Sequence, residues 1–230
     1  MVDDTDSAPS AAPLRRVAAE PSFWRALRGA LFAPRALFAG TRELTALGAP
    51  VRFAAGMGLL RGLFMSAIVV FFTTLLQGSE LFPATGLDDD AHFLLAKDLA
   101  VYLVGYPLAA VAGVFASGVV VQGVAALSGG RGSYARSVRV AAYASAPIFL
   151  VWIFHTGASM TIWPGTSWGP SVVALGWGGW VVAEGVTVLH GARRAWAYPV
   201  ALASLAGVWM VNARVLQPLV HALRAALRLS

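Results

Sequence analysis

The feature that most constrains this chain of 230 residues is a series of five apolar stretches, separated by short polar connectors. An α-helix rises 1.5 Å per residue, so about 20 apolar residues cross the roughly 30 Å hydrocarbon core of a bilayer. The five stretches cover residues 56–77, 100–127, 138–157, 171–190 and 197–213. We therefore predict an all-α integral membrane protein with a bundle of about five transmembrane helices.

The composition supports a membrane domain rather than a soluble one. The chain is 58% hydrophobic and only 12% charged, whereas soluble domains carry about 25% charged residues. Outside the apolar stretches no segment could bury a core of its own, so we expect one five-span domain over residues 51–213. The chain has no cysteine, which excludes disulfides, thiol catalysis and thiolate metal sites.

The segments at the two ends have a different character. Residues 1–20 are rich in Ala, Ser, Pro and charge, which predicts a disordered tail without the apolar core of a cleavable signal peptide. Residues 21–50 predict two amphipathic helices, and residues 214–230 an amphipathic C-terminal tail that is too polar to cross. In the N-terminal helices the apolar side chains that share one predicted face are Phe23, Trp24, Leu27 and Leu31.

Arginine lies beside that apolar face, a pattern typical of a helix in the plane of the headgroups. The alternative is that these helices pack under the membrane domain. The basic flanks of the apolar stretches also favour anionic lipid headgroups as a partner, rather than nucleic acid.

The distribution of Lys and Arg predicts the orientation, because these residues concentrate in cytoplasmic loops. Twelve arginines lie before Arg61, in the second-to-third connector and in the fourth-to-fifth turn, whereas the opposite loops hold only Lys97. The N-terminus is therefore expected in the cytoplasm. Five spans then place the C-terminal tail outside, where its three arginines are unexpected. Either the tail lies on the outer leaflet, which we favour, or the number of spans differs.

The segment from Leu127 to Pro147, LSGGRGSYARSVRVAAYASAP, resembles the signature of the bacterial branch of the Yip1 family. Members share a cytoplasmic amphipathic N-terminus, about five spans and a Gly-Gly-basic-Gly-Ser connector. A basic residue, a Tyr and a Pro follow that connector in the next span. The residues that match are Gly129, Gly130, Gly132, Ser133, Arg139, Tyr143 and Pro147.

The resemblance implies a location in the bacterial cytoplasmic membrane. Eukaryotic members are implied to act in vesicle trafficking, by contacting prenylated small GTPases and shaping membranes. Bacteria lack that machinery, so the role does not transfer, and the resemblance assigns no catalytic residue.

Polar residues inside predicted spans are functional candidates, because burying them in lipid is costly. Glu184, Arg61 and Gln122 lie at similar distances from the cytoplasmic ends of their spans. We predict that Glu184 pairs with Arg61, with Gln122 as a bridge. Glu184 is either structural, as part of an ion pair or as a protonated acid that hydrogen-bonds between helices, which we favour, or a site for a proton or cation.

Small residues at every fourth position predict close helix packing in the second span. This ridge consists of Gly105, Ala109, Gly113 and Ser117, and the first span adds Gly58 and Gly62. Packing within one chain is favoured over a dimer face, although a second copy or another membrane protein stays open as a partner.

No pattern predicts an enzyme, a metal site or a cofactor. Asp88, Asp89 and Asp90 are more typical of a solvated turn than of a calcium loop, the four histidines are scattered, and the GGRGS connector lacks the spacing of a phosphate-binding loop. We therefore expect a non-enzymatic membrane adaptor or organiser. The alternative is a small transporter or channel-like protein that uses Glu184.

Overall fold

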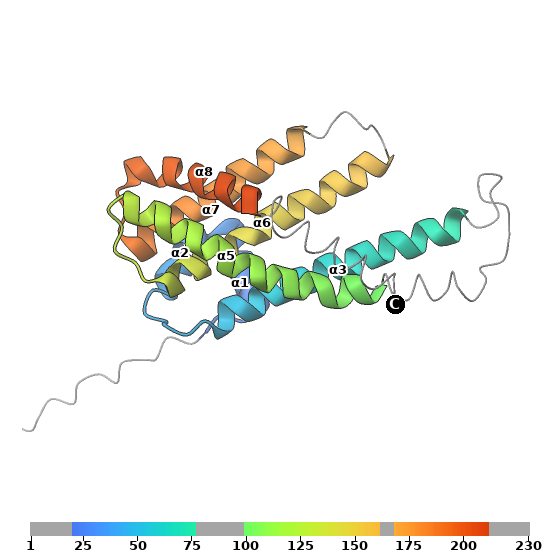
Figure 1. The fold of residues 1–230 in the computed structure, drawn as a ribbon, viewed down its shortest axis with the longest axis horizontal. Helices are drawn as coiled ribbons and strands as arrows, with labels where there is room; N and C mark the ends of the chain where they lie inside the picture. The colour runs from blue at the N-terminus through green and yellow to red at the C-terminus, as the bar shows by residue number, and fades with distance from the viewer. Residues whose placement is uncertain (1–19, 77–98, 162–167, 212–230) are drawn as a thin grey trace, which may run out of the picture.

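The computed structural model describes residues 20–76, 99–161 and 168–211, and within these ranges the chain is helical without any strand (Figure 1). The elements are α1 (Phe23–Phe32), α2 (Pro34–Gly40), α3 (Gly48–Leu76), the π-helical turn η1 (Val101–Gly105), α5 (Tyr106–Leu127), α6 (Tyr134–Thr161), α7 (Trp168–His190) and α8 (Arg194–Val211). The predicted N-terminal and C-terminal tails and the acidic stretch 78–99 lie outside the described residues, apart from Glu20 and Leu99.

Each of the five predicted spans falls on an observed helix. Three helical segments are long and apolar enough to cross a membrane, namely Gly48–Phe71, Val101–Leu127 and Val172–His190. A shorter apolar segment, Ala195–Ala206, lies in α8. The structure therefore confirms an all-helical protein of membrane type, while the count of five spans stays a prediction.

The bundle is organised around α6. This helix packs against α7, α5, α3 and α1, whereas α8 packs against α7 and α5. The short connectors 128–133 and 191–193 and the segment 41–47 lie at the same end of the bundle, on the left in Figure 1. We call this end the connector end.

Two glycines let α3 approach the start of α5 very closely. A Cβ atom at Gly58 would lie 2.6 Å from the carbonyl oxygen of Tyr106, and one at Gly62 would overlap the carbonyl of Tyr102. Pro107 accounts for the π-helical turn beside this contact. It has no N–H, and its ring would clash with the carbonyl four residues earlier in a regular helix, so the preceding turn widens.

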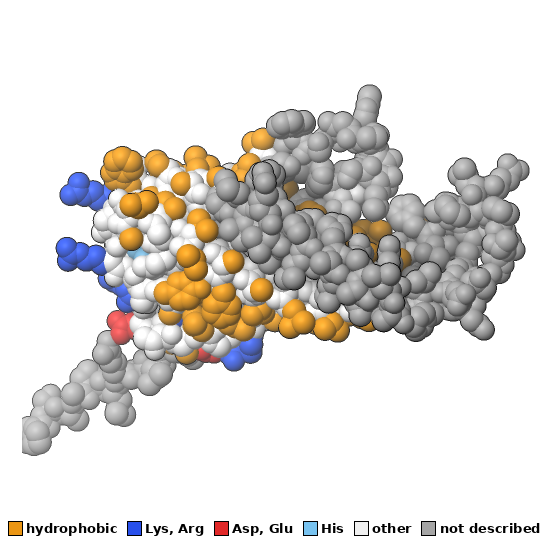
Figure 2. All heavy atoms as spheres, viewed as in Figure 1, with side chains coloured by type: hydrophobic (Ala, Val, Ile, Leu, Met, Phe, Trp, Pro, Cys, Tyr) orange, Lys and Arg blue, Asp and Glu red, His pale blue; other side chains and the backbone are white. Residues whose placement is uncertain are grey.

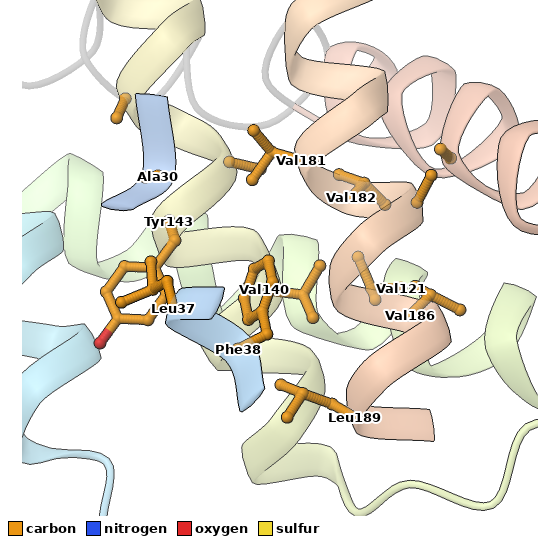
Figure 3. Close-up of a cluster of buried hydrophobic side chains, with 14 of the residues drawn as sticks. Ala30, Leu37, Phe38, Val121, Val140, Tyr143, Val181, Val182, Val186 and Leu189 are labelled. Carbon is orange, nitrogen blue, oxygen red and sulfur yellow. The ribbon is translucent and has the colours of Figure 1, made fainter. Parts of the chain in front are cut away.

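The N-terminal helices form a hairpin that packs into the bundle, as the alternative for this segment expected, while their contact with lipid headgroups stays a prediction. Pro34 starts α2 and ends α1. Leu37 and Phe38 of α2 lie among side chains of α6 and α7 (Figure 3). A Cβ atom at Gly185 would lie 3.0 Å from the Phe38 ring, so only glycine leaves room for the ring there.

Of the predicted apolar face of α1, Phe23, Leu27 and Leu31 pack against the core, and only Trp24 points outward. The buried side chains of α1 are Ala26, Ala30 and Leu31, while Trp24 is 69% exposed. The indole Nε1 of Trp177 donates to the carbonyl of Leu31 at 3.0 Å, which fixes the tip of the hairpin to α7.

Candidate functional site

The glycine-rich connector between α5 and α6 begins with a regular helix stop. Gly129 has φ +78°, a left-handed conformation that glycine adopts without strain. The N–H of Gly130 donates to the carbonyl of Ala125 at 2.9 Å, and the N–H of Gly129 donates to Ala126 at 3.0 Å. These two bonds satisfy the last carbonyls of α5 in a Schellman motif.

Beyond the stop, polar side chains from three helices form a buried group that we call the connector cluster. It consists of Gln122 on α5, Ser137 on α6 and His190 on α7, with the backbone of Gly132. Ser137 Oγ donates to Gln122 Oε1 at 2.7 Å and lies 3.2 Å from His190 Nε2. Gln122 Nε2 donates to the carbonyl of Gly132 at 3.0 Å.

The backbone strengthens the same junction. The N–H of Arg131 donates to the carbonyl of His190 at 2.9 Å, and the Arg136 guanidinium donates to the carbonyl of Leu189 at 3.0 Å. A Cβ atom at Gly132 would overlap the His190 imidazole. The connector therefore ties the ends of α5 and α7 to the start of α6.

Arg139 makes a second junction, between α6 and the segment that follows the hairpin. Its side chain is 1% exposed, and its guanidinium donates to the carbonyls of Thr41 at 2.9 Å, Leu44 at 2.6 Å and Ala46 at 3.2 Å. Three carbonyl dipoles thus surround a buried cation. Since Thr41 follows α2 directly, Arg139 fixes the base of the hairpin.

Tyr143 lies one helical turn beyond Arg139 and packs against aromatic rings. Its ring centroid is 5.1 Å from that of Phe53 on α3 and 6.0 Å from that of Phe38 on α2. Ser133 is exposed and its carbonyl accepts the N–H of Arg136 at the start of α6, whereas Pro147 is buried farther along α6. The signature residues therefore belong to one region, except for Pro147.

The predicted pairing of Arg61 with Glu184 is wrong. The Arg61 guanidinium lies over the rings of Trp152 and Tyr106, 4.3 and 4.8 Å from their centroids. Glu184 lies on α7, where its Oε2 is buried without a hydrogen-bond partner among the described residues. The physical reason is helix adjacency, because α3 packs on α5 and α6 while α7 packs on α6, α8 and α2.

Gln122 does not act as the predicted bridge, because the oxygen and the nitrogen of its side-chain amide both form hydrogen bonds within the connector cluster. His190 and Ser137 are the residues that the sequence analysis missed. They are 53 positions apart, and only the packing of α6 on α7 brings them together. Nothing in the sequence around His190 distinguishes it from the other three histidines of the chain.

The small-residue ridge of the second span is only partly buried. Ser117 is buried, and Gly105, Ala109 and Gly113 are half-buried. A Cβ atom at Gly105 would meet only Val101 of the same turn, whereas one at the neighbouring Gly118 would lie 2.8 Å from Val138 on α6.

Length, hydropathy and helix packing define a polytopic α-helical membrane protein with its connectors joined at one end. The Yip1 domain model matches residues 28–211, from the middle of α1 to the end of α8, and the chain belongs to the Yip1 domain family. No curated protein and no solved structure matches the chain.

Proposed function

We propose that this Yip1-domain protein is a non-enzymatic adaptor or organiser of the bacterial cytoplasmic membrane, with five spans and the connector end in the cytoplasm. The observation that carries the proposal is the joining of the connectors by the connector cluster and Arg139. These contacts give the connector end a fixed shape, which a docking surface requires.

The burial of the polar side chains supports a role in structure rather than catalysis. Ser137 and His190 form the one Ser–His contact among the described residues, and they are 0% and 4% exposed. A nucleophile and its base must reach a substrate, and these do not. Within residues 20–76, 99–161 and 168–211 there is also no group of three metal-ligating side chains.

Exposed arginines support the cytoplasmic orientation. Arg42, Arg131 and Arg193 are exposed in the three connecting segments, and basic side chains project from the connector end in Figure 2. Because Lys and Arg concentrate on the cytoplasmic side, this end is the one expected to face the cytoplasm.

Cysteine labelling tests the orientation directly, since the chain has no native cysteine. In intact cells, Ser133→Cys should be shielded from an impermeant thiol reagent and Ser167→Cys should be labelled. Labelling of Ser133→Cys together with protection of Ser167→Cys would reverse the proposed orientation.

Affinity purification from native membranes in mild detergent tests the adaptor role. The wild-type chain should retain a protein partner that is lost from the Arg42→Gln, Arg131→Gln, Arg193→Gln triple variant. Exposed substitutions change stability little, so the variant should keep its Tm. A partner retained equally by both chains, or none retained by either, would contradict docking at the connector end.

A second candidate function is transport, because the buried Oε2 of Glu184 has no hydrogen-bond partner among the described residues. A carboxyl group in this position could exchange a proton. Ion or proton flux into proteoliposomes that is lost in a stable Glu184→Gln variant would favour transport. The absence of flux from the wild-type chain would exclude it.

A further inference from the structure

The α1 helix presents a mixed aromatic and basic face to the outside of the bundle. Trp24 is 69% exposed and Phe32 is 70% exposed. Arg25 and Arg28 are exposed as well. Arg28 is four residues from both aromatic side chains, so all four residues share one side of the helix. We call this side the α1 outer face.

Packing holds the outer face in a fixed orientation. On the opposite side of α1, Ala26 and Ala30 are 2% and 0% exposed. Trp177 binds the carbonyl of Leu31 at the end of the helix. The helix cannot rotate to bury Trp24 and Phe32 without breaking these contacts, so the two rings stay available to a partner outside the described part of the chain.

The rise per residue of α7 and α3 indicates how far the hairpin tip lies from the connector end. Trp177 precedes His190 by thirteen residues, so the tip lies about 20 Å from the end of α7. On α3, exposed large apolar side chains begin at Leu59, about 16 Å from Gly48. The tip therefore lies near the level at which exposed large apolar side chains begin on α3, the helix that α1 also packs against.

The charges on this face are suited to an anionic partner. Among the described residues, Arg25 and Arg28 form no ion pair, and the ion pair nearby joins Glu20 to Arg52 on α3. Guanidinium groups bind phosphate through paired hydrogen bonds, and exposed aromatic rings anchor helices at the membrane interface.

From these observations we infer that the α1 outer face is a binding surface for acidic phospholipid. Arg25 and Arg28 hold headgroup phosphates, and Trp24 and Phe32 enter the upper acyl region. The inference rests on the proposed function only in placing the chain in a bilayer, because the surface would work equally in either orientation.

Lipid-quenching measurements on the full chain test the surface. Ala33→Cys, exposed beside Phe32, is labelled with bimane and reconstituted in phosphatidylcholine bilayers. These bilayers contain a second lipid, phosphatidylglycerol or phosphatidylcholine, brominated in the upper acyl chain. Brominated phosphatidylglycerol should quench the bimane fluorescence at a several-fold lower mole fraction than brominated phosphatidylcholine does. This preference for phosphatidylglycerol should shrink as ionic strength rises.

The arginine variants identify the source of the preference. Arg25→Gln and Arg28→Gln should each reduce it, by roughly fivefold at most, while Arg25→Lys with Arg28→Lys should retain most of it. Arg131→Gln with Arg193→Gln, which removes two exposed charges from the connector end, should leave it unchanged. Size-exclusion profiles and Tm values establish that each variant is folded.

Equal quenching by the two lipids would overturn the inference, as would a preference that survives both glutamine substitutions. An unquenched label would also overturn it, by showing that the tip does not contact the acyl chains. None of these outcomes depends on which side of the membrane the connector end faces. They are therefore distinguishable from failure of the proposed function.

Discussion

Arg139 shows how a cation is accommodated inside this bundle without a carboxylate. A planar guanidinium carries five donors in a fixed arrangement, and three carbonyls around it accept from two of its nitrogens. A lysine ammonium is a smaller, more strongly hydrated charge and cannot span the same three oxygens.

Substitution of Arg139 should therefore be strongly destabilising. Arg139→Ala removes the three hydrogen bonds that this buried cation donates to carbonyls and should lower the free energy of unfolding by about 3 kcal/mol or more. The free energy of unfolding of Arg139→Lys should lie between that of Arg139→Ala and that of the wild type. Thermal unfolding in detergent measures both, with exposed Arg131→Ala as the control. A Tm of Arg139→Ala equal to that of the control would show that the carbonyl contacts do not stabilise the fold.

The connector cluster makes a second prediction, for Gly132. An added methyl group at this position would overlap the His190 imidazole, so Gly132→Ala should destabilise by about 1–3 kcal/mol. Gly123 on α5 has nothing within 4 Å of its Cβ position, so Gly123→Ala should be neutral or stabilising by up to about 1 kcal/mol. Equal Tm shifts for the two variants would contradict the close contact.

The α1–α2 hairpin shows which properties of an element can be predicted from the sequence. Pro34 and the helical spacing of apolar residues correctly predicted two short helices. Hydropathy also predicted that Leu27 and Leu31 share the inward face. It did not predict that Ala26 and Ala30 are buried beside them while Trp24 is exposed. Small residues allow close helix contact, whereas a large ring would hold the helices apart.

At this scale we predict that Phe38 anchors the hairpin. Its ring is fully buried, against Gly185 and near Tyr143, so Phe38→Ala should destabilise by about 3–5 kcal/mol. Phe32→Ala removes a ring of the same size from an exposed position and should change stability by about 0.5 kcal/mol at most. Thermal unfolding compares them, and hydrogen exchange should show loss of protection in α1 and α2 for Phe38→Ala alone. Unchanged protection would mean that the hairpin is held by other contacts.

For the whole molecule, the positions of the helices were predictable and their adjacency was not. An apolar stretch is a property of consecutive residues, so its length alone indicated where each helix would lie. Arg61 and Glu184 were matched by depth along their helices, but depth does not identify neighbours. The aromatic contacts of Arg61 with Tyr106 and Trp152 depend on the packing of α3 with α5 and α6.

A double-mutant cycle distinguishes the two arrangements. Because Arg61 and Glu184 do not touch, the losses of unfolding free energy in Arg61→Leu and Glu184→Leu should add up to the loss in the double variant, to within about 0.5 kcal/mol. Arg61→Leu and Trp152→Leu should instead be coupled by about 0.5–2 kcal/mol, the range of a cation–π contact. Thermal unfolding in detergent supplies the six stabilities needed: the wild type, three single variants and two double variants. Strong coupling between Arg61 and Glu184 would contradict the observed arrangement and support the ion pair predicted from the sequence.

The bond from Trp177 to Leu31 also has a consequence for the order in which the chain is made. The two residues are 146 positions apart, and at about 5–20 residues per second a ribosome needs roughly 7–30 s to cover that distance. The hairpin leaves the ribosome before α6 and α7, and its binding surface is complete only after α7 has followed. During that interval its apolar residues need temporary cover. The surface of the membrane into which the later helices are being inserted is the nearest apolar material available.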